Sequence, residues 1–127
     1  MDKTELKLRT RNFALRAIKF VEALPRTRTA DVIGKQALRS TSVAGNYRAA
    51  CRAKSRADFV SMMGTVEEEC DETLFWMEML VESDQVKPSR MEYLMKEADE
   101  LIQIVVASAR TARGSRIPQS ANRSPQS

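Results

Sequence analysis

The sequence predicts an all-α fold: a single antiparallel up-down-up-down four-helix bundle. Residues that favour helices dominate the 127 positions, while glycine and proline occur only four times each. Apolar residues recur at three- and four-residue steps in four segments, at about residues 4–23, 29–52, 56–82 and 89–112. The links between these segments are short, which favours antiparallel neighbours. We therefore expect one bundle over residues 1–113.

The first two helices follow from apolar spacing and from a helix breaker. In residues 4–23 the apolar positions keep to one side, at Leu6, Phe13, Ala17, Phe20, Val21 and Leu24. Pro25 ends this helix. Residues 29–52 then carry an inner face of mostly small residues, Ile33, Ala37, Ser40, Ala44, Tyr47 and Cys51. Small side chains let a neighbouring helix approach closely.

The last two helices have local start signals. Ser55 is the expected N-cap of residues 56–82, with Asp58 three residues later. The apolar seam of that helix is Phe59, Met63, Val66, Cys70, Leu74, Met77 and Val81. Pro88 opens residues 89–112, whose seam is Met91, Leu94, Ala98, Leu101, Val105, Ser108 and Ala112. Residues 114–127 lose all periodicity and are predicted to be a disordered C-terminal tail.

The second and third helices are expected to fold back on each other around residues 53–55. In that register Gly45 lies beside Met63 and Gly64, which suggests backbones in close contact. The same register predicts ion pairs between bases of one helix and acids of the other: Arg39 with Glu68 and Glu69, and Lys35 with Asp71 and Glu72. Exposed pairs of this kind fix the alignment of helices more than they stabilise it.

Charge is unevenly distributed along the chain. The net charge is +4, but residues 1–57 hold fourteen Lys and Arg against four acids, whereas residues 58–87 hold one Lys against nine acids. Four cations near the second turn have no acid among their neighbours from residue 44 to 57, and we call them the basic elbow: Arg48, Arg52, Lys54 and Arg56. Such a cluster suits a phosphate backbone, with binding that depends heavily on salt. The alternative is a solvated helix end that complements its own macrodipole.

Several function classes are disfavoured by what the chain lacks. It has no histidine, the commonest general base and metal ligand. The acidic run 67–72 lacks the Glu-x-x-His pattern of di-iron bundles, so no metal site is expected. We expect no cofactor and no enzymatic activity. No aromatic residues are interleaved with the elbow cations, which argues against recognition of single-stranded bases.

Cysteine usage and hydropathy indicate a cytoplasmic protein. Cys51 and Cys70 each occupy a helical position that suits a small apolar residue, and both are expected to be reduced. The first residues are too charged for a secretory signal, and no apolar run approaches the ~20 residues that cross a bilayer. We therefore expect no membrane association.

The third helix is apolar over more than one stripe between Leu74 and Val81. A lone four-helix bundle covers one stripe per helix, so a second face would be buried against another subunit. Phe75 and Trp76 are interpreted as core or oligomer face rather than as a cofactor pocket. The sequence therefore predicts a homo-oligomer.

An ordered series of short motifs resembles the family of 23S rRNA intervening-sequence proteins over residues 13–113. The strongest part is Ile33-Gly34-Lys35-Gln36, Leu38-Arg39-Ser40, Ser42-Val43, Asn46-Tyr47-Arg48, Ala50-Cys51-Arg52-Ala53-Lys54-Ser55 and Asp58-Phe59, followed by Glu67-Glu68, Asp71-Glu72-Thr73 and Trp76. Many members have Asn-Ile-Ala-Glu-Gly where this chain has residues 46–50, so no role tied to that acid and glycine carries over. The chain is similar to a tyrosine-arginine subgroup.

This resemblance implies a bacterial antiparallel bundle that assembles as a ring-shaped homopentamer without known enzymatic activity. A related branch, the accessory variability determinant of diversity-generating retroelements, uses a basic pentamer to bind nucleic acid and a reverse transcriptase. Other members are encoded inside insertions within ribosomal RNA genes. By analogy we expect an oligomeric protein that contacts RNA or DNA through its basic surface, with the basic elbow as the site. The alternative is a protein-interaction scaffold or accessory subunit that does not itself bind nucleic acid.

Overall fold

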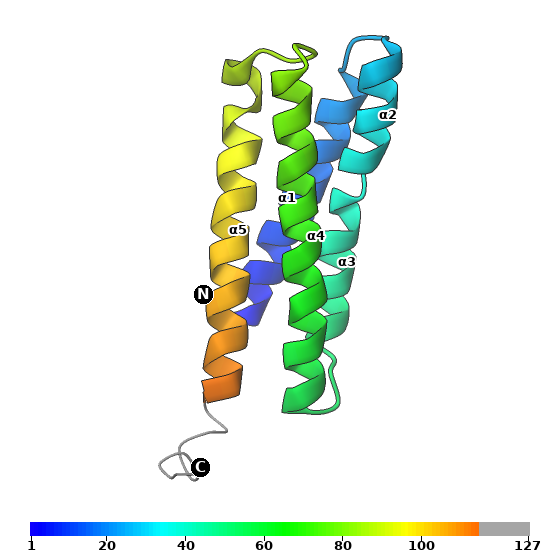
Figure 1. Ribbon diagram of the computed structural model, residues 1–127. Helices are drawn as coiled ribbons and strands as arrows, with labels where there is room; N and C mark the ends of the chain where they lie inside the picture. Colours follow the sequence, from blue (N-terminus) through cyan, green and yellow to red (C-terminus); the bar gives the residue numbers. More distant parts are fainter. Residues whose placement is uncertain (115–127) are drawn as a thin grey trace.

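The computed structural model describes residues 1–114, apart from the side chain of Ser40, and every regular element in that part of the chain is a helix. The helices are α1 (Lys3–Glu22), α2 (Arg28–Ala37), α3 (Ser40–Ala50), α4 (Arg56–Glu82) and α5 (Pro88–Gly114). Figure 1 shows α2 and α3 end to end as one arm, and the four arms run in alternating directions. The expected all-α bundle is confirmed.

The segment 29–52, predicted as one helix, is divided at Leu38 and Arg39. There the backbone tightens to three-residue hydrogen bonds, Thr41 N to Leu38 O at 3.1 Å and Ser42 N to Arg39 O at 2.9 Å. The hydroxyls of Thr41 and Ser42 also donate to these two carbonyls. Serine and threonine compete with the helical ladder in this way, which explains why the single predicted helix is replaced by α2 and α3.

The tightened turn changes which residues face inward. A 3₁₀ step rotates the chain by about 120° per residue instead of about 100°, so the inner face shifts across the turn. The residues buried before and after it are Ala30, Gly34 and Ala37 in α2, and Val43, Tyr47 and Ala50 in α3. Of the predicted inner face, Ala37 and Tyr47 are buried, whereas Ile33, Ala44 and Cys51 are half-buried.

The other helix ends lie within two residues of the predicted ones. Ser55 caps α4 as predicted, because its hydroxyl accepts a hydrogen bond of 3.0 Å from the Asp58 backbone N–H. Asp2 and Glu5 form a capping box that starts α1. After α4, Asp84 adopts a positive φ of 62° in the turn to α5. Gly114 is the last residue of α5 rather than the first of a tail, and the predicted disorder of residues 115–127 lies outside the described residues.

The core lies along the axis of the bundle. α4 packs against α5, α3 and α2, while α1 packs mainly on α3. The residues of α4 and α5 in the core are Met63, Val66, Cys70, Met77, Leu80, Met91, Leu94, Ala98, Leu101, Val105 and Ala109. Most of the two predicted seams is therefore confirmed. Thr73 takes the inner place predicted for Leu74, because the seam keeps the 3.5-residue spacing of supercoiled bundles.

The predicted register between the second and third helices is wrong. Glu69 accepts hydrogen bonds from Ser42, at 2.9 Å, and from Asn46, and no ion pair of Lys35 or Arg39 occurs among residues 1–114. Glu69 thus lies beside residues three and seven positions after Arg39, its predicted partner, so the two helices are offset by about one turn from the predicted register.

The predicted close approach of glycines is also wrong. Gly45 and Gly64 are exposed, and a Cβ at either position would meet nothing within 4 Å. The glycine that permits close packing is Gly34, where a Cβ would lie 3.0 Å from Leu24 Cδ1 and 3.3 Å from Val21 Cγ1.

Candidate nucleic-acid interface

The basic elbow occupies the turn between α3 and α4, at one end of the bundle. Arg48 lies in the last turn of α3, Arg52 and Lys54 in the connection, and Arg56 at the first position of α4. All four side chains are exposed. The sequence-predicted residues are therefore all exposed at one end of the bundle.

None of these four cations is engaged by an acid of residues 1–114. The ion pairs within 4 Å in this part of the chain both belong to Arg9, which binds Glu97 through Nε at 2.7 Å and Glu100 through Nη2 at 2.6 Å. The hydrogen bond to Glu97 is the largest cause that raises the pKa of the Arg9 guanidinium. The elbow cations make no such contact, so their charge is directed to solvent.

The acidic part of α4 is well separated from Arg56, whereas Arg48 is nearer to it, because Asn46 two residues earlier hydrogen-bonds Glu69. Residues 68–72 begin twelve positions after Arg56, which is about 18 Å along a helix. The Debye length is about 8 Å at physiological ionic strength, so exposed charges at that separation are largely screened from each other. The start of α4 is therefore basic and its middle acidic in the folded structure, as in the sequence.

Further cations join the elbow at the same end. Figure 1 shows that α1 begins and α5 ends toward the end of the bundle that carries the α3–α4 connection. This placement adds the exposed residues Lys3, Lys7, Arg110 and Arg113. Sequence reasoning missed the two arginines of α5, although the antiparallel topology it predicted already places the end of the fourth arm beside the second turn.

A cavity of about 730 Å³ opens among these cations. α1 has 20 residues, whereas α4 and α5 have 27 each, so α1 is about 10 Å shorter and leaves this end of the bundle uncovered. Apolar and hydroxyl-bearing side chains from all sides line the space, including Leu6, Phe59, Ile104, Ser108 and Thr111. Ser108 and Ala112, predicted as core, instead line this cavity.

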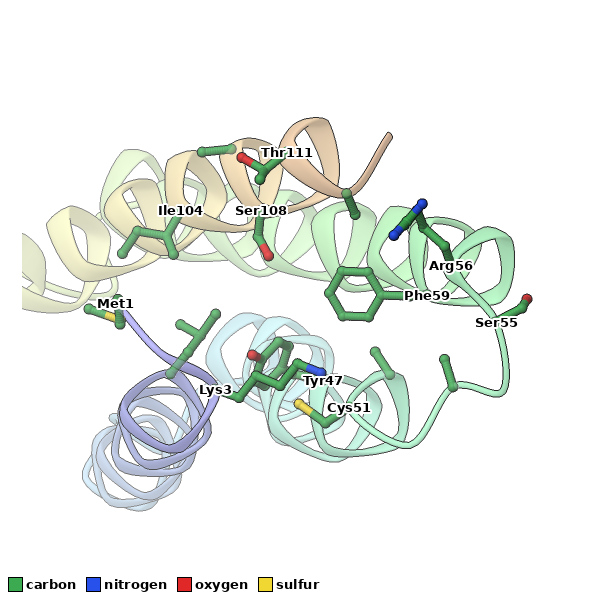
Figure 2. A pocket seen from close by; sticks show the side chains of 15 residues that line it. Met1, Lys3, Tyr47, Cys51, Ser55, Arg56, Phe59, Ile104, Ser108 and Thr111 are labelled. Atoms are coloured by element: carbon green, nitrogen blue, oxygen red, sulfur yellow. The ribbon is translucent and has the colours of Figure 1, made fainter. Parts of the chain in front are cut away.

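Figure 2 shows Tyr47, Cys51, Phe59 and Lys3 in the cavity. The Lys3 Nζ lies 5.7 Å from the centre of the Phe59 ring, within cation–π range. Burial raises the pKa of the Tyr47 hydroxyl, and its hydrogen bond with the Cys51 side chain raises it further, so Tyr47 remains neutral. The fold therefore places aromatic residues beside the elbow, although none is interleaved with the cations in the sequence.

Comparisons with known proteins agree with this architecture. The family model described as 23S rRNA-intervening sequence protein matches residues 3–107. A crystal structure from Bacteroides thetaiotaomicron, of a protein with unknown function from the S23 ribosomal protein family, is 27% identical. The alignment covers 87% of this chain and 99% of that chain, with a TM-score of 0.80. A search of curated proteins finds no significant match.

Proposed function

The chain belongs to the 23S rRNA-intervening sequence protein family, and on that premise we propose that it binds RNA or DNA through the basic elbow, without catalysing a reaction. The observation that carries this proposal is the cluster of exposed cations at one end of the bundle. In the part of the chain that the structure describes, Arg48, Arg52, Lys54 and Arg56 have no acidic partner. A phosphate backbone supplies the missing counter-charge at regular spacing.

A binding role suits the chemistry of the remaining side chains. The chain has no histidine. Burial raises the pKa of the Cys70 thiol to about 12, which keeps it protonated and unreactive. No helix of residues 1–114 is long and apolar enough to cross a membrane.

The proposed binding unit is a homo-oligomer, which repeats the basic elbow around a symmetry axis. Several large apolar side chains point away from the core: Leu8 is 58% exposed, Leu15 51%, Val32 57% and Phe75 46%. Leu8 and Leu15 are seven residues apart and so lie on one face of α1. These faces also support the second candidate, a scaffold that recruits another protein through apolar contact. Light scattering that returned a monomer would remove the oligomer from the proposal.

A filter-binding titration with a structured RNA and a DNA duplex of equal length tests the proposal. The triple variant R48Q/R52Q/R56Q is expected to bind at least tenfold more weakly at low salt, because each arginine removed takes away one phosphate contact. Circular dichroism must show an intact bundle. Retention of neither nucleic acid at low salt would overturn the proposal.

The matched control is R26Q/R28Q/R90Q. It makes the same change of charge with three exposed arginines at the opposite end of the bundle. We expect it to keep most of the wild-type affinity. Equal losses in the two triple variants would mean that net charge, rather than the elbow, governs binding. Capture of a defined protein partner after nuclease treatment, with no binding to nucleic acid, would favour the scaffold.

A further inference from the structure

The cavity beside the basic elbow has the features of a binding site for one flat, polar-edged group. It exists because α1 is shorter than its neighbours, so the inner faces of α3, α4 and α5 continue beyond the point where α1 covers them. Its volume of about 730 Å³ falls within the range of about 300–1,000 Å³ typical of small-molecule sites.

The lining combines three kinds of group. Phe59 supplies a half-buried aromatic ring. Ser108 and Thr111 supply hydroxyls, and within residues 1–114 neither hydroxyl makes a hydrogen bond to another group. Lys3 and Arg56, both labelled in Figure 2, supply positive charge to the lining.

This combination matches an unpaired nucleotide better than a wholly apolar ligand. A nucleobase has an apolar face that stacks on aromatic rings, a polar edge that hydroxyls can satisfy, and phosphates on both sides. A hydrocarbon chain would cover the half-buried Ser108 hydroxyl without giving it a partner, which is unfavourable, whereas the edge of a base could meet both this hydroxyl and that of the exposed Thr111. Because a hydroxyl both donates and accepts, these residues would accept any of the four bases.

Resting on the proposed function, we propose that the cavity receives one unpaired base of the bound nucleic acid, stacked on Phe59, while Lys3 and Arg56 bind the flanking phosphates. Lys3 now lies over the Phe59 ring, and its flexible side chain moves to a phosphate when the base takes that place. The protein then prefers bulged or looped RNA to a continuous duplex of the same length.

The test uses two hairpin RNAs with 2-aminopurine at one position, bulged in the first and paired in the second. We expect tighter binding of the bulged RNA and a rise in its fluorescence as the base leaves the RNA stack. The variant Phe59→Leu keeps an apolar side chain but loses the flat ring, so the preference for the bulge should fall about fivefold to tenfold. Phe20→Leu, the same change at a half-buried position near the end of α1 and outside the cavity, should leave the preference unchanged.

A second measurement needs no substitution in the cavity. Cys51 lines the cavity, and its alkylation rate in the wild-type protein reports whether the space is occupied. The bulged RNA should slow alkylation of Cys51, and the paired RNA at equal saturation should not. Protection that instead rises with protein concentration, without RNA, would mean that a second copy of the chain fills the cavity and would overturn the inference.

The outcomes separate this inference from the proposed function. Equal affinity for both RNAs, with no change in fluorescence, overturns the base site and leaves the elbow as a phosphate-binding surface. Binding of neither RNA at low salt overturns both.

Discussion

The Arg9–Glu97 contact should be the strongest polar link between α1 and α5, and a double-mutant cycle measures it. The guanidinium donates from Nε to Glu97 Oε2 at 2.7 Å and from Nη2 to Glu97 Oε1 at 2.8 Å, which is a bidentate arrangement. The two side chains are 26% and 15% exposed. Arg9 follows the cavity-lining residue Leu6 by three positions and Glu97 precedes the cavity-lining residue Ile104 by seven, and α1 and α5 have few other contacts, so the pair helps to position the wall formed by α5.

The magnitude lies between those of surface and buried pairs. An exposed ion pair contributes ~0–1 kcal/mol, whereas a hydrogen bond to a charged group contributes about 1.5–3 kcal/mol. Because about a quarter of the Arg9 side chain remains in water, we expect a coupling energy of about 1–2 kcal/mol. For a chain of this size each kcal/mol shifts the melting temperature by about 3–5 °C.

Urea unfolding of the wild type, R9Q, E97Q and R9Q/E97Q at one protein concentration gives the coupling energy. The single variants should lose about 1.5–3 kcal/mol each, and the double variant less than their sum. Partial burial limits screening, so at least half of the coupling should persist in 1 M NaCl. A coupling energy below about 0.3 kcal/mol would refute the structural reasoning.

Two further predictions concern the helix glycines and the buried thiol. Gly45→Ala and Gly64→Ala should each raise the free energy of unfolding by about 0.5–1 kcal/mol, because a Cβ meets nothing there, whereas Gly34→Ala should gain less, since its Cβ would lie 3.0 Å from a leucine methyl. A loss of stability at Gly45 or Gly64 in urea unfolding would contradict the observed packing. A disulfide-exchange reagent at pH 8 should modify Cys51 in the native protein and Cys70 only after unfolding. Because folding raises the pKa of the Cys70 thiol from 9.0 to about 12, the contribution of the protonated thiol to stability is complete below pH 9 and is lost as the pH rises toward 12. An unchanged pH midpoint of alkaline unfolding in Cys70→Ala would contradict this.

The parts of the fold that local signals determine were predictable from the sequence. Ser55 starts a helix because its own hydroxyl satisfies a backbone N–H three residues later, and no distant contact is required. Pro25 and Pro88 act in the same local way on the first and last arms.

The features that were missed depend on competition or on distant parts of the chain. The break at Leu38 and Arg39 comes from hydroxyls that compete for helical carbonyls, and the apolar spacing alone does not report that competition. The register between α3 and α4 is set by hydrogen bonds of Glu69 to uncharged partners, while charge matching had favoured Arg39.

The candidate site was predicted only in part for the same reason. The lack of acidic partners for the four elbow cations was predictable because residues 44–57 contain no acid. The cavity instead depends on where α1 begins relative to α5, and it brings together Lys3, Phe59 and Thr111, which are far apart in the sequence. Only the assembled bundle shows aromatic and basic groups in one place.

The salt dependence of nucleic-acid binding tests the central claim most directly. For a duplex, the slope of log K against log salt is about −0.9 for each phosphate that the protein neutralises. If Arg48, Arg52 and Arg56 each contact one phosphate, R48Q/R52Q/R56Q should reduce the steepness of that slope by about 2–3, while R26Q/R28Q/R90Q leaves it unchanged. An identical slope for the wild type and the elbow variant would contradict the account.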